Sequence, residues 1–269
     1  MRITSKSRSS GGIALALAAA ALTAAPAYAQ DFAWNGRIAP GQTVEIKGVN
    51  GSIRAVRADG DAVTVDAVKR ARRSNPDEVE IVVVEHSGGV TICAVYPTPA
   101  GARPNECAPG DGGRLSSREN DVRVDFTVRV PDDIHLVART VNGEIDARGL
   151  GGDVVARTVN GDVTIETAGT AEAQTVNGSI EAALGRADWS GRIDFKTVNG
   201  SITLELPVDL HTDLRARTVN GGIETDFPLQ IRGRLIRTRV NGRIGEGGRE
   251  LSLETVNGSI RLRKAAGAT

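Results

Sequence analysis

The apolar residues of this chain follow one short pattern that recurs along most of its length. The pattern is centred on the tripeptide Val-Asn-Gly, and positions −6, −4, +3 and +5 from its Asn are mostly apolar. Around Asn142 these positions hold Leu136, Ala138, Ile145 and Ala147. Apolar residues at every second position indicate a strand with one buried face. Each repeat therefore predicts two short strands joined by a tight bend.

Val-Asn-Gly occurs eight times, and after a first gap of 92 residues the steps are 18, 17, 22, 21, 21 and 16. Such steps suit one coil of a β-solenoid, whereas helical repeats need roughly 33 residues or more. We therefore predict an all-β fold, a β-solenoid like a parallel β-helix with an N-terminal flanking β region. The predicted bend residues are Asn50, Gly51, Asn142, Gly143, Asn160, Gly161, Asn177, Gly178, Asn199, Gly200, Asn220, Gly221, Asn241, Gly242, Asn257 and Gly258.

The main alternative is an antiparallel meander, because Asn-Gly also favours two-residue hairpin turns. Successive turns of a meander alternate between the two edges of a sheet and would seldom share one sequence. The same turn in every repeat favours stacked coils instead. In such a stack Asn and Gly tolerate the positive φ of a sharp corner, and the Asn side chains can hydrogen-bond along the column.

Position −2 of the repeat predicts a second column, made of threonines. By the parity of the strand it points inward beside the bend, where a hydroxyl can reach a neighbouring backbone group. A Ser or Thr nucleophile needs a base within reach, and no His is placed beside these residues, so we expect a structural role. The threonines are Thr140, Thr158, Thr175, Thr197, Thr218 and Thr255.

The repeat around Asn241 departs from the pattern, because Arg237 and Arg239 stand at its −4 and −2 positions. Two arginines cannot lie unpaired in a core, so we expect a one-residue slip that turns Ile236 and Thr238 inward. The slip has two interpretations, a bulge or a functional cleft.

The region between the first two repeats predicts four further strands, which we expect to cap the open end of the solenoid as a flanking sheet. A loop rich in Gly, Pro and charge lies between the third and fourth of these strands, at residues 98–120, and we expect it to be mobile but held at one end by a disulfide. The predicted strands are Val63 to Val68, Val79 to Val84, Val90 to Tyr96 and Val122 to Val130. The predicted divisions are a signal peptide at 1–29, an N-terminal β region at 30–131, the solenoid at 132–264 and a tail at 265–269.

Residues 1–29 have a basic start, an apolar run and a small-residue site ending at Ala29, which predicts a secretory leader. We expect the mature chain to be exported to the periplasm or the cell surface, without a transmembrane segment. Removal of the leader lowers 33 Lys and Arg to 30 against 33 Asp and Glu, which gives no electrostatic case for nucleic-acid binding.

The chain has two cysteines, Cys93 and Cys107, and an oxidising compartment favours a disulfide between them. Such a bridge closes a loop of about 15 residues and contributes roughly 3 kcal/mol by chain entropy. Free thiols and a metal site are the alternatives. A metal site is disfavoured because there is no second cysteine pair and the three histidines are scattered.

Some outward positions of the repeat carry mostly basic residues, and other outward positions carry mostly acidic residues. Coils stack about 4.8 Å apart, so we predict a basic stripe on one strand face and an acidic stripe on the other. We hypothesise that the basic stripe contacts an anionic envelope polymer or an acidic partner surface; the alternative is a solvated face whose charges prevent edge pairing. The basic stripe is Lys47, Arg139, Arg157, Lys196 and Arg217, and the acidic residues are Asp146, Glu181, Glu224, Glu144 and Asp162.

A leader, an N-terminal β region and repeated Thr-Val-Asn-Gly-x-Ile coils resemble the bacterial putative adhesin family, β-strand-repeat proteins of the cell envelope. The resemblance covers residues 44–262 and departs at the disulfide-bearing insertion. It implies a β-solenoid at the envelope with a role in adhesion or surface interaction. It carries over no catalytic, cofactor-binding or metal-binding residue.

We therefore predict a non-enzymatic adhesin, or an interaction or scaffold module, of the envelope. One alternative is a carbohydrate-active enzyme, a polysaccharide lyase or hydrolase, built on a β-helix. Such sites need clustered carboxylates and aromatic platforms, but aromatic residues make up 3% of the chain and the adjacent Asp132 and Asp133 would point to opposite faces of a strand. Another alternative is a self-assembling structural protein, because solenoid ends expose strand edges.

Overall fold

The computed structural model describes residues 32–231 and 237–265. The predicted leader, Ile236 and residues 266–269 of the predicted tail lie outside the described residues. The N-terminal elements are β1 (Phe32–Gly36), β2 (Thr43–Lys47), β3 (Ile53–Arg57), β4 (Val63–Arg70), the 3-10 helix η1 (Pro76–Glu78), β5 (Glu80–His86), β6 (Gly89–Val95) and β7 (Arg123–Val130).

The remaining strands carry most of the repeats. They are β8 (His135–Arg139), β9 (Ile145–Leu150), β10 (Val154–Arg157), β11 (Val163–Thr167), β12 (Ala171–Gln174), β13 (Ile180–Leu184), β14 (Arg192–Lys196), β15 (Ile202–Leu206), β16 (Thr212–Arg217), β17 (Ile223–Thr225), β18 (Leu229–Ile231), β19 (Arg239–Ile244), β20 (Glu250–Glu254) and β21 (Ile260–Lys264).

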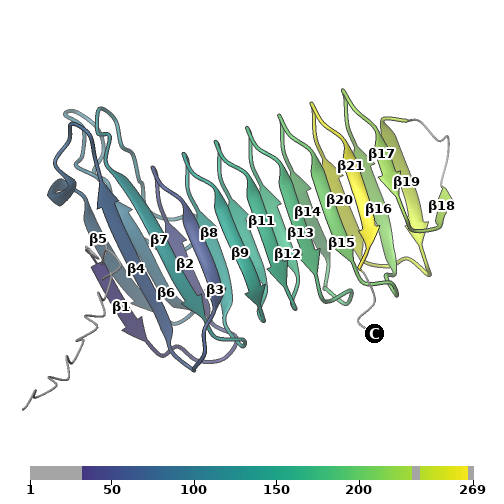
Figure 1. The fold of residues 1–269 in the computed structure, drawn as a ribbon, viewed down its shortest axis with the longest axis horizontal. Helices are drawn as coiled ribbons and strands as arrows, with labels where there is room; N and C mark the ends of the chain where they lie inside the picture. Colours follow the sequence, from purple (N-terminus) through teal and green to yellow (C-terminus); the bar gives the residue numbers. More distant parts are fainter. Residues whose placement is uncertain (1–31, 232–236, 266–269) are drawn as a thin grey trace, which may run out of the picture.

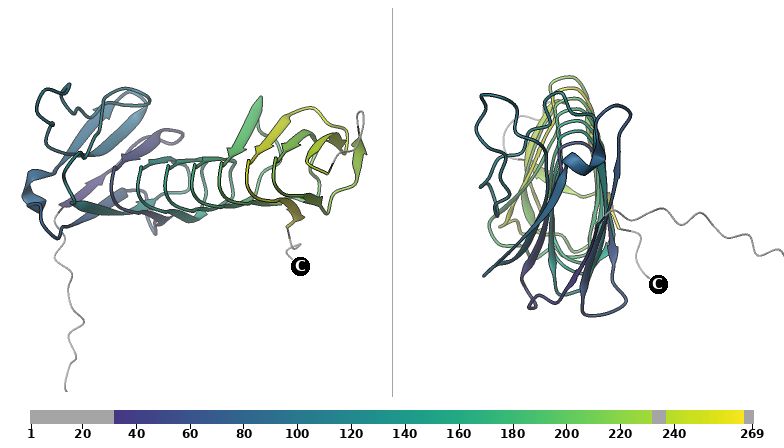
Figure 2. Two further views of the ribbon diagram at one scale, coloured as in Figure 1. Left: turned by 90° about the horizontal axis from the view of Figure 1, so that it is seen from above. Right: turned by 90° about the vertical axis from the view of Figure 1, so that its left-hand side faces the viewer.

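These strands form two sheets that face each other along the length of the molecule (Figure 1). Sheet A has the order β1-β4-β7-β3-β9-β11-β13-β15-β21-β17, and sheet B has the order β18-β19-β16-β20-β14-β12-β10-β8-β2-β6-β5. Each coil adds one strand to sheet B, bends at Val-Asn-Gly, and adds the next strand to sheet A. Neighbouring coils pair in parallel. The predicted all-β solenoid is confirmed, and its flattened coils are seen end-on in Figure 2.

The core lies between the two sheets and is filled by the residues that alternate inward. Leu136, Ala138, Ile145 and Ala147 of one coil are each 1% exposed or less, as the repeat pattern predicts. Burial of such aliphatic side chains is the main stabilising term, about 1.5–3 kcal/mol for each large one.

The bends stack into a column held together by asparagine side chains. The Nδ2 of Asn142 donates a hydrogen bond to the Oδ1 of Asn50 at 2.8 Å, and the same bond recurs between every neighbouring pair of bends, at 2.7–2.8 Å. Each inner asparagine therefore donates to one coil and accepts from the next, which fixes the register of the coils.

The threonine column lies beside the asparagines and is buried, as its parity predicts. Each hydroxyl donates to the bend-glycine carbonyl of the neighbouring coil, for example Thr158 to Gly143 at 2.9 Å and Thr197 to Gly178 at 2.8 Å. A buried carbonyl without a donor would be costly, so these threonines stabilise the bend rather than carry chemistry.

The bend glycines are required for a reason other than the one the sequence suggested. Gly143, Gly161, Gly178 and Gly200 do not adopt positive φ. A Cβ added at Gly178 would instead lie 2.0 Å from the carbonyl oxygen of Gly161, and the other three meet the same kind of backbone contact. Close stacking of backbone on backbone therefore requires glycine here, and the positive-φ explanation is wrong for these four coils.

The last coil of the chain does not lie at the end of the stack. The column of bends runs Asn50, Asn142, Asn160, Asn177, Asn199, Asn257, Asn220. The Asn257 coil is thus intercalated between two coils that precede it in sequence: β20 pairs with β14 and β16, and β21 pairs with β15 and β17. Among the described residues, the strands of the Asn199 coil do not pair with those of the Asn220 coil, and both coils pair with the intercalated coil.

The Asn241 repeat is not a bend, so the predicted turn at Asn241 and Gly242 is wrong. Asn241 lies within β19, which runs antiparallel to β16 and places Asn241 opposite Arg215. The expected change of parity does occur: Val240 and Ile244 are buried and Arg239 is exposed. Because arginine cannot take the inward positions of a parallel coil, this segment folds back as an antiparallel strand instead.

The four strands predicted before the second repeat are present, but they do not form one flanking sheet. β7 and β4 continue sheet A beyond β3, whereas β6 and β5 continue sheet B beyond β2. Both sheets are continuous across the predicted division at residue 131.

The asparagine column gives a direct prediction for Asn177→Asp. Aspartate cannot donate to Asn160, and its charge lies against the Asn160 oxygen, so we expect a loss of about 1–2 kcal/mol in the free energy of unfolding. Urea unfolding followed by circular dichroism measures this loss. The control is Asn35→Asp, because Asn35 is an exposed residue of β1 outside the column; equal stabilities of the two variants would contradict a stabilising column.

Candidate functional site: the outer face of sheet B

The register of sheet B brings the five residues of the basic stripe into one row that crosses the sheet. Two residues from other strands interrupt the stripe, and β19 extends it by one arginine. The full order is Lys47, Arg139, Arg157, Gln174, Lys196, Glu254, Arg217, Arg239. All these side chains lie on the outer face of the sheet, because the residue next to each of them in its strand is buried in the core.

The N-terminal end of the row is covered by residues 98–120, which we call the strap. The Lys47 Nζ donates to the strap carbonyls of Ala108, Gly110 and Gly112 at 2.5, 2.6 and 3.1 Å. Burial lowers the pKa of Lys47, although the nearby Glu45 carboxylate opposes this shift. The expected mobile loop is thus packed onto the sheet, and Lys47 is withdrawn from the exposed surface.

The strap also places a carboxylate on the row. Asp111 Oδ1 lies 2.5 Å from Arg139 Nη1 and 3.6 Å from Arg157 Nη1. The hydrogen bond from Arg139 lowers the pKa of Asp111, and the charges of both arginines add to the shift. Because the pKa of Asp111 is lowered in the folded protein, this contact stabilises the fold fully at pH values above the ordinary aspartate pKa. That stabilisation is lost as the pH falls through the lowered pKa.

The disulfide ties the strap to sheet B. Cys93 of β6 is joined to Cys107 of the strap. The Asn105 side chain reinforces the attachment, because its Nδ2 donates to the carbonyls of Tyr96 and Ser116, both at 2.9 Å. The strap is therefore fixed covalently at one point and by the Lys47 ammonium at another.

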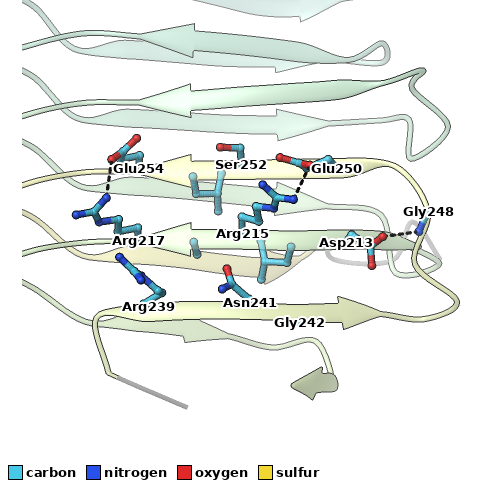
Figure 3. A pocket seen from close by; sticks show the side chains of 13 residues that line it. Asp213, Arg215, Arg217, Arg239, Asn241, Gly242, Gly248, Glu250, Ser252 and Glu254 are labelled. Atoms are coloured by element: carbon cyan, nitrogen blue, oxygen red, sulfur yellow. Dashed lines mark hydrogen bonds and ion pairs between the residues drawn. The ribbon is translucent and has the colours of Figure 1, made fainter. Parts of the chain in front are cut away.

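A hollow of about 610 Å³ lies at the C-terminal end of the row, over β16, β19 and β20 (Figure 3). Arg215 Nη2 lies 3.4 Å from Glu250 Oε2, and Arg217 Nη1 lies 3.9 Å from Glu254 Oε1. Among the residues that the structure describes, Arg239 has no ion-pair partner. The polar side chains of the hollow are Asp213, Arg215, Arg217, Arg239, Asn241, Glu250, Ser252 and Glu254.

Sequence reasoning missed most of this hollow. It found Arg217 from the repeat, but not Arg215 or Arg239, because their neighbourhood depends on the antiparallel β19 and the intercalated β20. The sequence did contain one sign of the hollow, because the Asn241 repeat departs from the apolar pattern. A functional cleft was one of the two interpretations of that departure. Asp111 was also missed, since nothing local indicates that the strap folds over the row.

The predicted acidic stripe on sheet A is wrong as an uninterrupted stripe. The row that holds Asp146, Glu181 and Glu224 also contains Arg54 and Arg261, and Arg261 Nε lies 3.3 Å from Glu224 Oε2. Sheet A therefore has a mixed-charge outer face. The other two acids, Glu144 and Asp162, lie beside the bends, where Asp162 accepts a hydrogen bond from the Ser179 amide at 2.7 Å.

Within residues 32–231 and 237–265, no group of three or more His, Cys, Asp or Glu side chains is arranged to hold a metal ion. The acidic pair considered for an enzyme, Asp132 and Asp133, lies in a turn before β8, and Asp132 is paired with Arg57. In the same described part of the chain, no helix has the length and apolar character needed to cross a membrane.

The fold and its asparagine column define a two-sheet β-solenoid. Residues 153–263 match the family described as Toastrack DUF4097. No curated protein matches the chain. The resemblance drawn from the Thr-Val-Asn-Gly repeats is confirmed.

Two solved structures are similar over most of the chain. One is a "putative cell adhesion protein" from Clostridium sporogenes ATCC 15579, with 10% identity, a TM-score of 0.45, and coverage of 87% of this chain and 99% of that one. The other is a "putative adhesin" from Bacteroides fragilis NCTC 9343, with 10% identity, a TM-score of 0.26, and coverage of 87% and 96%.

The packing of the strap predicts the effect of Lys47→Met. The three strap carbonyls lose a charged donor, and hydrogen bonds to charged groups contribute about 1.5–3 kcal/mol each, so we expect amide exchange in residues 105–115 to rise roughly tenfold or more. Hydrogen–deuterium exchange with mass spectrometry measures it. Lys264→Met serves as the control, because Lys264 is exposed. Unchanged exchange in Lys47→Met would mean that the lysine does not hold the strap.

Proposed function

We propose that the protein is an exported, non-enzymatic interaction module of the cell envelope, an adhesin or scaffold that binds an anionic partner on the outer face of sheet B. The observation that carries this proposal is the row that crosses sheet B, in which six of eight residues are Lys or Arg. The predicted leader and the Cys93–Cys107 disulfide support an extracytoplasmic location.

A rigid row suits a partner with repeated negative charge. One exposed ion pair contributes only about 0.2–1 kcal/mol, so a single arginine would bind weakly. Cations held at the spacing of the strands can contact several charges of one polymer or surface at once, and the later contacts are then effectively intramolecular. The asparagine column keeps that spacing fixed before binding.

The test is co-sedimentation of the mature chain, beginning at Gln30, with a total envelope fraction at two salt concentrations. We expect binding that weakens with salt, and binding roughly tenfold weaker in the triple variant Arg157→Ser, Lys196→Ser, Arg217→Ser. The matched control removes three exposed arginines from sheet A: Arg54→Ser, Arg148→Ser, Arg263→Ser. Equal sedimentation of wild type and the sheet B triple variant would refute the proposal.

A further inference from the structure

We propose that Arg217 and Arg239 form a binding site for the carboxylate group of an acidic polysaccharide, with the sugar lying in the hollow of Figure 3. This inference rests on the proposed function and narrows it to one place on sheet B and one class of ligand.

A second pair of arginines in the same row offers a comparison for Arg217 and Arg239. Arg139 and Arg157 are partners on adjacent strands of the row, and the Asp111 carboxylate contacts both of them. Two paired arginines of this row therefore already bind a carboxylate in this structure. Arg217 and Arg239 are likewise partners on adjacent strands of the same row and the same face.

The two arginine pairs differ in solvent exposure and in the carboxylates that lie near them. The Arg139 side chain is 25% exposed beneath the strap, whereas the Arg217 side chain is 55% exposed. The only carboxylate paired with Arg217 among the described residues is Glu254, at 3.9 Å, which is beyond hydrogen-bond range, and Arg239 has no ion-pair partner in that part of the chain. Both guanidinium groups thus keep donors for a ligand, in a planar arrangement that matches a carboxylate.

Polar side chains surround Arg217 and Arg239 in the hollow. Asn241 and Ser252 bring an amide and a hydroxyl to the hollow, and Asp213 and Glu250 bring carboxylates. Figure 3 shows these side chains on the same face of the sheet as the arginines. Such groups can donate to and accept from the hydroxyls of a sugar, and together with two arginines they suit a saccharide that carries acid groups.

The same lining disfavours an acidic protein as the ligand. Protein interfaces depend on buried aromatic or aliphatic anchors that enter complementary pockets. The apolar residues that line the hollow are Leu214, Ala216 and Leu253, and each is 1% exposed because it faces the core. The hollow thus offers a partner polar groups rather than an apolar contact surface.

The experiment measures binding of the mature chain to polygalacturonate, a polymer of uronic acid, by biolayer interferometry. We expect binding to be roughly tenfold weaker in Arg217→Ser, Arg239→Ser, since both guanidinium groups that contact the ligand carboxylate are lost. The sheet A pair Arg54→Ser, Arg263→Ser removes the same charge and should bind like wild type. Arg217→Lys, Arg239→Lys keeps the charge without the planar fork, and we expect intermediate affinity. Thermal unfolding of each variant confirms that it is folded.

Two comparison polymers decide the class of ligand. Neutral dextran should not bind. Stronger binding of polyglutamate than of polygalacturonate would favour an acidic polypeptide and overturn the saccharide assignment. Equal polygalacturonate binding by wild type and the Arg217, Arg239 double serine variant, or none by wild type, would overturn this site. In both cases the proposed function still stands if envelope binding depends on the basic stripe, so the two failures are distinguishable.

Discussion

Gly178→Ala is expected to lower the free energy of unfolding by about 3 kcal/mol or more, one of the two largest effects that this structure predicts. The added Cβ would lie 2.0 Å from the carbonyl oxygen and 2.5 Å from the carbonyl carbon of Gly161. Both contacts are with backbone that is itself fixed by the asparagine bonds and by the Thr175 hydroxyl, which donates to the Gly161 oxygen at 2.9 Å. The Gly161 carbonyl group cannot move away from the added Cβ without breaking those bonds.

The matched control is Gly60→Ala, because a Cβ at Gly60 meets nothing within 4 Å and its backbone does not adopt positive φ. Chemical unfolding should leave the Gly60 variant within about 0.5 kcal/mol of wild type. Equal stabilities of the two variants would show that the bends are not stacked as closely as described here.

Ending the chain at Gly248 is expected to unfold the C-terminal end of the stack, although the Asn220 coil itself remains in the chain. The truncation removes β20 and β21, and with them Leu251, Leu253, Ile260 and Leu262, all 1% exposed or less. It also removes the coil that lies between the Asn199 coil and the Asn220 coil and pairs with both. Residues 207–231 and 237–248 should then exchange their amide hydrogens at rates near those of an unfolded chain, while residues 43–184 stay protected.

The control truncation ends at Ala265 and keeps the intercalated coil, so its exchange should match that of the full chain. A stack built in sequence order would respond differently to loss of the last coil, because the Asn220 coil would remain paired with the Asn199 coil. Full protection of residues 212–225 in the chain that ends at Gly248 would therefore contradict the intercalated order.

The features that sequence analysis predicted are those that a single coil determines. Inward positions such as Leu136 and Ile145 follow from the period of two, and the placement of Thr158 follows from its parity beside the bend. These features depend on residues a few positions apart, and the same local solution is repeated in each coil, so the repeat count strengthens the prediction.

The order of the coils could not be predicted in the same way. The Asn199, Asn220 and Asn257 coils present the same Asn, Thr and Gly groups to their neighbours, so the Asn257 coil fits against the Asn199 coil as well as the Asn220 coil would. Order is then set by the connecting segments and by the antiparallel β19, which pairs with β16 and occupies its outer side. The step lengths between repeats do not encode that choice.

The candidate site was predicted only in part for the same reason. The basic stripe follows from one position of the repeat and is brought together by the register. Its two ends differ because of long-range contacts: Asp111 of the strap covers Arg139, whereas β19 places Arg239 beside Arg217. A loop that folds back and a strand that reverses leave no periodic signal in the sequence.

The central claim, that the outer face of sheet B is the binding surface, is tested most directly by site-specific photo-cross-linking in the envelope. A photoreactive side chain at Gln174 lies within the row without removing a charge, and one at Thr203 lies at the corresponding outward position of sheet A. We predict cross-linked envelope material from position 174, lost at high salt, and none above background from position 203. Cross-linking from position 203 alone, or equally from both positions, would contradict the claim.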